Sequence, residues 1–294
     1  MSDVLELYGT STRSTGMIDW SAISKEQLCP YLGRKCIKVR KSEPEQTIGT
    51  CTVLYGKQPR PIIICPNRLL ERHQVFVDCL HLLTVHEPGN QLHIVPEVSI
   101  PGGSVDYFFV SAKGNRVRDF VGIELQTLDT TGTVWPERQR FLKEQGAPYG
   151  KPSSTGDKGY GMNWKMTAKT ILMQLHHKVQ TFESINKHLV LVIQDSFLDY
   201  MRGEFKFDHL NNALVGDPMH IHTYRLAQAS NGDLHLELNS RFSTDSNGIA
   251  LSLGLKASPR VNLDEIVQVL ESKISDATLF SPISTLVSAK LLNI

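Results

Sequence analysis

The chain has 294 residues, a formal net charge of +1 and 40% apolar residues. This length allows one large domain or two modest ones, and the composition is that of a globular protein rather than of a fibre or a disordered chain. No apolar run approaches the roughly 18 to 20 residues of a spanning helix, and the N-terminus lacks the layout of a signal peptide. The sequence therefore predicts a cytoplasmic protein with no membrane partner.

The balanced total charge excludes the strongly basic type of nucleic-acid-binding domain. Positive charge is nevertheless grouped, around the second cysteine and again along residues 165–178. A solvated surface is the ordinary interpretation of such groups, so a case for DNA binding needs further motifs.

Residues 21–67 are rich in turn residues and contain four of the five cysteines: Cys29, Cys36, Cys51 and Cys65. The segment is too small for a large core of its own, so we expect something other than hydrophobic burial to hold it. Four thiolates form a tetrahedral site for zinc or iron that supplies folding free energy. The gaps are wider than in a CxxC finger, which leaves reduced buried cysteines as the alternative. Cys79 falls at an apolar position of a predicted helix, and we expect it in the core.

The rest of the chain predicts an α/β order of elements. Apolar spacing and turn signals predict helices over Leu69–Leu83, Trp135–Gln145, Asn163–Glu183 and Asn262–Ile274. Alternation and apolar runs predict strands over His93–Ile100, Val105–Ala112, Val117–Leu128, His188–Gln194, Met219–Ala227, Leu234–Leu238 and Ile249–Leu255. Residues 146–161 are typical of an exposed loop, and loops of this length are often functional.

Polar side chains on two neighbouring predicted strands form the most informative pattern. Asp106 lies on one strand, and Glu124 and Gln126 lie on the next, where alternation turns both to the same face. If the strands pair around residues 113–116, the carboxylates of Asp106 and Glu124 approach each other. Paired carboxylates repel unless a cation lies between them, and magnesium prefers such oxygen ligands. The pattern therefore indicates a magnesium site that activates water against a phosphodiester.

Two further acids, Glu97 and Asp129, lie close in sequence to this pattern, and each is either part of the site or structural. The alternative for the whole pattern is a set of polar residues on a half-exposed strand, because an Asp followed by Glu-x-Gln is common. Its specificity comes from the cysteines that precede it and the helix that follows.

The combined order of motifs resembles the PD-(D/E)xK nucleases, and in particular the NotI family of type II restriction enzymes, from about Cys29 to about Phe197. Asp106 matches the aspartate of the pattern and Glu124 the glutamate, whereas Gln126 replaces the usual lysine, a variant expected in the NotI group. The succession of cysteines looks like that family's four-cysteine module, whose metal is structural iron. Spacing alone does not separate iron from zinc.

The resemblance implies an α/β PD-(D/E)xK core over residues 71–294, with a mixed sheet flanked by helices, and a metal-binding module in residues 1–70. It implies a restriction endonuclease that hydrolyses double-stranded DNA with magnesium at a palindromic, GC-rich site and leaves a 5′-phosphate. Asp106, Glu124 and the Leu125 carbonyl would bind magnesium, and uncharged Gln126 would orient water or phosphate. Palindromic cleavage implies a homodimer with one active site per strand.

DNA contacts are expected from two basic groups: Lys35, Lys38 and Arg40 near the cysteines, and Lys165 and Lys169 at the start of a helix. Lysines or arginines beside phosphates position a protein on DNA, and a helix N-terminus favours an anion. His220 and His222 share a strand face, but no third metal ligand is evident, which favours hydrogen-bonded or surface histidines.

Two other functions compete with the restriction enzyme. One is a modification-dependent or repair nuclease of the same fold, and the absence of an ATP-binding motif argues against a motor-coupled one. The other is a non-catalytic DNA-binding regulator built on the four cysteines, in which the acids are incidental. Replacing Glu124 separates a nuclease from the regulator. A nuclease would lose cleavage, whereas DNA binding by the regulator would be unaffected.

Overall fold

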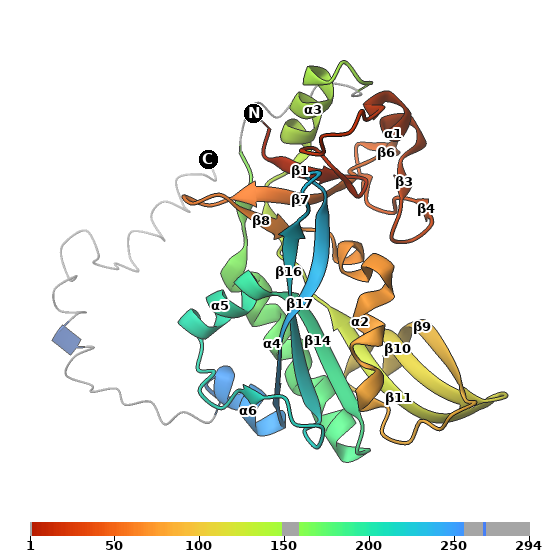
Figure 1. The fold of residues 1–294 in the computed structure, drawn as a ribbon. Helices are drawn as coiled ribbons and strands as arrows, with labels where there is room; N and C mark the ends of the chain where they lie inside the picture. The colour runs from red at the N-terminus through yellow and green to blue at the C-terminus, as the bar shows by residue number, and fades with distance from the viewer. Residues whose placement is uncertain (1, 149–158, 256–266, 269–294) are drawn as a thin grey trace, which may run out of the picture. The chain divides into compact units, whose positions relative to one another are not determined.

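In the computed structural model, residues 2–148, 159–255 and 267–268 are described (Figure 1). The chain divides into two units, Met1–Leu255 and Lys256–Ile294, and the second lies almost wholly outside the described residues. The expected boundary at residue 70 falls inside the first unit and stays a prediction. Among the described helices, none is long and apolar enough to cross a membrane.

A seven-stranded mixed sheet, in the order β15-β17-β16-β14-β11-β10-β9, forms the centre of the first unit. At one end is an antiparallel meander of β9 (Gln91–Ile100), β10 (Gly103–Lys113) and β11 (Arg116–Leu125). The parallel strands β14 (His188–Gln194) and β16 (Met219–Gln228) follow, and then the antiparallel strands β17 (Leu234–Thr244) and β15 (Asn211–Asn212). Every residue of β14 is buried, as expected for a parallel strand covered on both faces.

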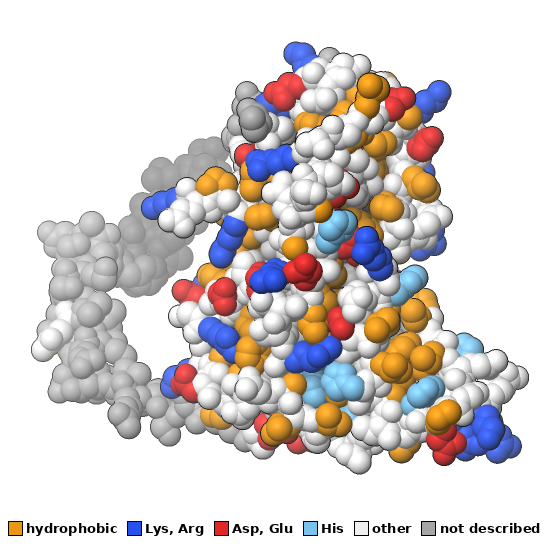
Figure 2. Space-filling view, viewed as in Figure 1, with side chains coloured by type: hydrophobic (Ala, Val, Ile, Leu, Met, Phe, Trp, Pro, Cys, Tyr) orange, Lys and Arg blue, Asp and Glu red, His pale blue; other side chains and the backbone are white. Residues whose placement is uncertain are grey.

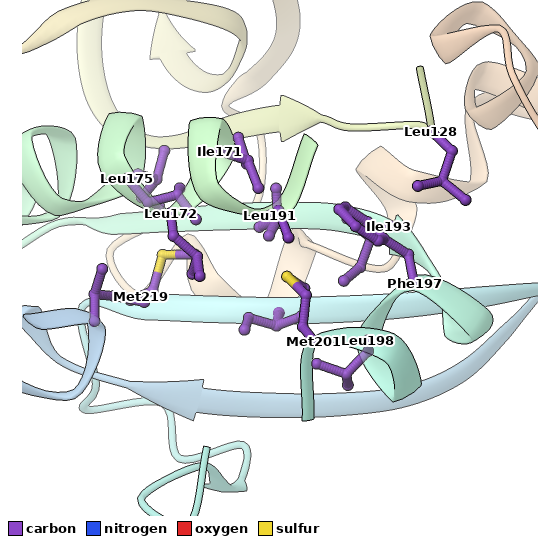
Figure 3. Packing of buried hydrophobic residues seen from close by; sticks show 14 of the residues in the cluster. Leu128, Ile171, Leu172, Leu175, Leu191, Ile193, Phe197, Leu198, Met201 and Met219 are labelled. Carbon is purple, nitrogen blue, oxygen red and sulfur yellow. The ribbon is translucent and has the colours of Figure 1, made fainter. Parts of the chain in front are cut away.

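Helices cover both faces of this sheet, so the predicted α/β class with a mixed, helix-flanked sheet is confirmed. On one face lie α4 (Trp164–Ser184) and α5 (Asp195–Glu204), and Figure 3 shows Ile171, Leu172 and Leu175 of α4 packed towards Leu191 and Met219. On the other face, Leu69, Leu70, Val75, Phe76 and Leu82 pack against β11 and β14. Full burial of each such side chain stabilises the fold by about 1.5–3 kcal/mol.

The N-terminal region contains more regular structure than its sequence indicates. A four-stranded sheet consists of β2 (Thr10–Ser11), β1 (Val4–Leu7), β7 (Thr50–Tyr55) and β8 (Arg60–Ile63). Two short strand pairs belong to this region: β3 (Leu28–Cys29) with β4 (Arg34–Lys35), and β5 (Val39–Arg40) with β6 (Glu43–Thr47). A third pair, β12 (Thr130–Thr131) with β13 (Gly161–Met162), comes later in the chain. Two helices, α1 (Trp20–Glu26) and α3 (Trp135–Glu144), meet where Trp20 packs edge-on against Phe141 with ring centroids 4.8 Å apart.

The expectation that hydrophobic burial does not hold residues 21–67 is wrong. Val53 and Ile62 are fully buried in the main core, and Ile64 joins them. The segment does not need a core of its own, because β7 and β8 place its apolar side chains against residues far away in sequence. Such long-range burial is not visible in a local composition.

Two predicted elements are also wrong. Leu69–Leu83 is not one helix but η1 (Pro66–His73), α2 (Gln74–Val77) and η2 (Leu80–Leu82), because Arg72 and His73 turn left-handed at φ 51° and 55°. The predicted strand Ile249–Leu255 is instead mostly within α6 (Ser246–Ser252), which begins where the Asp245 carboxylate accepts a hydrogen bond from Gly248 N at 2.8 Å. A short apolar run does not distinguish a strand from a helix. Apart from residues 267–268, the predicted helix Asn262–Ile274 lies outside the described residues, as does most of the predicted loop.

Candidate active site

Three carboxylates form one row across the antiparallel meander. Strands β10 and β11 pair around residues 113–116 as expected, and the pairing of Tyr107 with Ile123 makes Asp106 and Glu124 the next opposed residues. On the other side, Val105 pairs with Val98 and Tyr107 with Pro96, so that Asp106 also lies opposite Glu97. Acids at opposed positions of neighbouring strands repel one another. The row therefore concentrates negative charge at one point of the sheet.

Glu124 is the most enclosed member of the row, with only 4% of its surface exposed. Its Oε1 atom accepts a hydrogen bond from Lys178 Nζ at 2.6 Å. Burial raises the pKa of Glu124 to about 7, and the charge of Asp106 adds to this effect while Lys178 opposes it. The ionised form of this carboxyl thus depends on nearby positive charge.

Asp106 is half-buried, and its Oδ2 atom accepts a hydrogen bond from the main-chain N–H of Leu125 at 2.8 Å. Burial raises the pKa of Asp106 and the neighbouring Glu97 raises it further, whereas the Leu125 N–H and the charge of Lys178 lower it. A divalent cation between Asp106 and Glu124 would offset both the burial and the repulsion. The donor set is therefore one that magnesium prefers.

An open pocket of about 400 Å³ lies beside two acids of the row, Glu97 and Asp106. Its lining comes from two distant parts of the chain: Leu32, Arg34, Ile37, Pro66, Asn67, Pro96, Glu97, Asp106, Tyr107 and Leu125. Arg34 thus lies in the same pocket as the two acids Glu97 and Asp106, although some 60–70 residues separate them in sequence. A cation beside acids in an open pocket suits a phosphate group held next to a metal site.

Gln126 and Asp129 lie beyond the end of β11 and outside the acid row. The Gln126 main-chain N–H donates to the Val192 carbonyl at 3.0 Å, and its side-chain Nε2 donates to the Thr127 carbonyl at 2.6 Å. Asp129 instead meets the start of α4, because its carbonyl accepts a hydrogen bond from Asn163 N at 2.8 Å. The structure thus places Asp106 opposite Glu124 and Glu97. The side-chain amide of Gln126 is instead hydrogen-bonded to the next residue, Thr127.

Lys178 is the site residue that the sequence did not assign a role. It lies on α4 and is buried, at 5% exposure, among Leu175, Val179 and Phe182. The signal was present, because a lysine within the apolar stripe of a long helix needs a buried partner. That partner, Glu124, is 54 residues away and is not identifiable from periodicity.

The four N-terminal cysteines line one small pocket together with Tyr8, Lys38, Gly49 and Thr50. The thiol of Cys51 donates to the Gly49 carbonyl at 3.5 Å. The adjacent Cys51 thiol lowers the pKa of Cys65 to about 6, with help from the charge of Lys38. Four sulfurs are a suitable donor set for zinc or iron. Even so, in the described part of the chain no group of three or more His, Cys, Asp or Glu side chains is arranged to hold a metal ion. Cys79 is fully buried in the core, as expected.

The basic residues expected to contact DNA are dispersed. Lys35 donates to the Glu45 carbonyl and Lys38 to the Ile64 carbonyl, while Arg40 pairs with Glu43 at 2.7 Å. Figure 2 shows lysines and arginines scattered among acidic and apolar side chains on the face in view.

At the start of α4, Lys165 and Lys169 are exposed, and Lys165 lies 3.5 Å from Glu204. Thirteen residues separate Lys165 from Lys178, which is about 20 Å along a helix axis. The helix start is therefore distant from the acid row.

The mixed sheet and the row of acids, two of which line an open pocket, define an α/β protein with a carboxylate site on its sheet meander. The family model of the restriction endonuclease NotI matches residues 21–235, which include the cysteines, the acid row and Lys178. The chain belongs to the NotI restriction endonuclease family. At the level of that family it is a type II site-specific deoxyribonuclease, with DNA as substrate and a divalent metal as the general requirement. In a comparison with curated proteins, none matches the chain.

Proposed function

We propose that this chain cuts double-stranded DNA as a magnesium-dependent enzyme of the PD-(D/E)xK type. The observation that carries the proposal is the opposition of Asp106 and Glu124 across β10 and β11, where burial and mutual charge make a cation favourable. Family membership supports the reaction class. Asp106, Glu124 and the Leu125 carbonyl are the proposed magnesium ligands.

Bound magnesium would supply an activated water and offset charge that develops on the phosphate. The water oxygen bonds to phosphorus, the bond from phosphorus to the 3′ oxygen breaks, and that oxygen takes up a proton, which leaves a 5′-phosphate. Asp106 is held for this role by the Leu125 N–H, and Glu124 by Lys178. Gln126 carries no charge and would orient water or phosphate through hydrogen bonds.

DNA would approach over the pocket that contains Arg34 and Asp106. Phosphate contacts are proposed for Lys35, Lys38 and Arg40 on the cysteine side, and for Lys165 and Lys169 on α4. The exposure of Lys35, Lys38, Lys165 and Lys169 supports these contacts. A palindromic, GC-rich site cut by a homodimer is the accompanying proposal, which rests on the family.

The four cysteines are proposed to hold structural iron or zinc. The support is that all four line one pocket and that three of them, Cys29, Cys51 and Cys65, are buried. Binding would require the sulfurs to close around the ion, which couples metal uptake to the conformation of the segment. The competing proposal is a set of reduced core thiols.

The direct test is to incubate the purified protein with unmethylated phage DNA in magnesium or in EDTA and to sequence the ends. Glu124→Gln keeps the shape of the side chain and removes its charge, and Glu237→Gln, at an exposed position of β17, is the matched control. Discrete fragments with 5′-phosphates, made only with magnesium and lost only in Glu124→Gln, are expected. A Glu124→Gln variant that cuts like the wild type would contradict the assignment.

Methylated DNA as substrate distinguishes a modification-dependent nuclease from a restriction enzyme. If only methylated DNA is cut, the chain is a modification-dependent nuclease of the same fold. If neither substrate is cut and Glu124→Gln binds DNA as the wild type does, the chain is the non-catalytic regulator. Ends that map to a two-fold symmetric sequence would support the homodimer.

A further inference from the structure

The acid row meets a buried ammonium group from the helix above it. Lys178 Nζ lies 2.6 Å from Glu124 Oε1, and each side chain is only 6% exposed. The charge of Lys178 acts on Asp106 as well as on Glu124. One cation on α4 thus serves both acids of the proposed site.

Stability alone does not account for a lysine at this position. Removing a lysine and a carboxylate from water is costly, and replacing such a pair with apolar residues is often neutral or stabilising. The surrounding stripe of α4, with Leu175, Val179 and Phe182, would accept an apolar side chain without a polar partner. The pair is therefore better explained by what it does for the acids.

The turn between β9 and β10 fixes Lys178 relative to the row. Gly102 has φ +97°, and a Cβ there would lie 3.0 Å from the His177 carbonyl oxygen. The Thr181 hydroxyl donates to the Pro101 carbonyl at 2.7 Å. These contacts dock the turn on the same stretch of α4 that carries Lys178, so that helix and meander are held in register.

The chain directly after β11 has an uncharged residue where the Glu-x-Lys pattern has a cation. Gln126 occupies the position of the usual lysine in the Glu-x-Lys pattern, and its amide nitrogen is bound to the Thr127 carbonyl. We propose that Lys178 supplies from α4 the positive charge that Gln126 does not, and that it positions the Glu124 carboxylate. Because it is buried, Lys178 acts through Glu124 and not by touching DNA. The inference rests on the proposed function of the acid row.

Relocating the charge tests this inference. Lys178→Met is expected to lower kcat for phage DNA about 100-fold, since the removed charge stabilises the acid pair in a water-poor site. Gln126→Lys combined with Lys178→Met is expected to return kcat to within about 10-fold of the wild type, and Lys178→Arg to keep part of the activity. Gln126→Lys alone should bring no comparable gain.

The matched control is Lys187→Met, because Lys187 pairs with buried Asp119 at 2.7 Å on the same strand as Glu124 but away from the row. It should lower the thermal midpoint and leave kcat unchanged. Binding of a mixed-sequence duplex in EDTA provides a readout without turnover. The loss of one positive charge in Lys178→Met should weaken duplex binding about 3-fold. Adding Gln126→Lys to this variant should restore the binding.

A folded Lys178→Met protein with wild-type kcat and wild-type binding would overturn the inference. So would a folded double variant that stays inactive while Lys178→Arg is active, because geometry and not charge would then be decisive. A wild-type protein that does not cut would instead refute the proposed function. DNA binding by the variants in EDTA would still show whether a lysine at position 126 can replace the charge of Lys178.

Discussion

At the scale of single residues, the acid row is a place where function and stability oppose each other. Asp106 is half-buried beside Glu97 and opposite Glu124, and both burial and the neighbouring charge raise its pKa. Charge held in this way destabilises the fold when no cation is bound. Natural sites retain such strain because the same charges bind the ligand.

Replacing Asp106 should therefore separate the two properties. Asp106→Asn keeps an oxygen that accepts the Leu125 N–H and removes the charge. In EDTA the variant should be more stable than the wild type, because the raised pKa of Asp106 shows that the folded state disfavours the ionised carboxylate. Magnesium-dependent cleavage should be lost. Urea unfolding with and without magnesium measures both effects, and a destabilised variant in EDTA would contradict the account.

At the scale of elements, the β9–β10 turn determines how closely the meander approaches α4. Gly102 should not tolerate a side chain, because of its φ of +97° and the His177 carbonyl 3.0 Å from a Cβ. Gly102→Ala should cost about 2 kcal/mol and reduce cleavage, since Lys178 would shift away from Glu124. Gly114→Ala in the β10–β11 turn, with φ +56° and open space, is the control and should cost about 1 kcal/mol without loss of cleavage.

The cysteine segment gives a second prediction at this scale. If Cys29, Cys36, Cys51 and Cys65 hold a metal, Cys65→Ser should lose bound iron or zinc and lower the thermal midpoint together. Cys79→Ser in the core should lower the midpoint without changing the metal content. Elemental analysis of protein purified without added metal is the measurement. Metal-free wild-type protein, stable to chelators, would favour reduced core thiols instead.

The elements predicted correctly from the sequence are those whose signal is local. The apolar stripe of α4 and the continuous apolar run of β14 extend over many residues and match the structure closely. The strand expected at Ile249–Leu255 failed because its run is short and a capping aspartate precedes it. Pairing of Asp106 with Glu124 follows from a hairpin, whereas Lys178 and Arg34 reach the site through contacts between distant segments.

At the scale of the whole molecule, buried histidines and buried acids give stability opposite dependences on pH. His220 and His222 are fully buried, and burial lowers their pKa values to about 4 and about 3. The unfolded state binds protons at these positions below about pH 6.5 and the folded state does not, so stability is lost as the pH falls. In that range each histidine lowers the free energy of unfolding by about 1.4 kcal/mol for each pH unit by which the pH falls.

Glu124 acts in the opposite direction in EDTA. Its folded pKa of about 7 lies above the ordinary value of 4.5, so the folded state binds the extra proton and gains stability between pH 7 and 4.5. This gain partly offsets the loss of stability that the two histidines cause, and Glu124→Gln removes it. From pH 7 to pH 5 its free energy of unfolding should fall more steeply than that of the wild type, by up to about 1.4 kcal/mol per pH unit. Replacing His220 and His222 by glutamine should flatten the curve, and parallel curves for all three proteins would show that these side chains do not control acid stability.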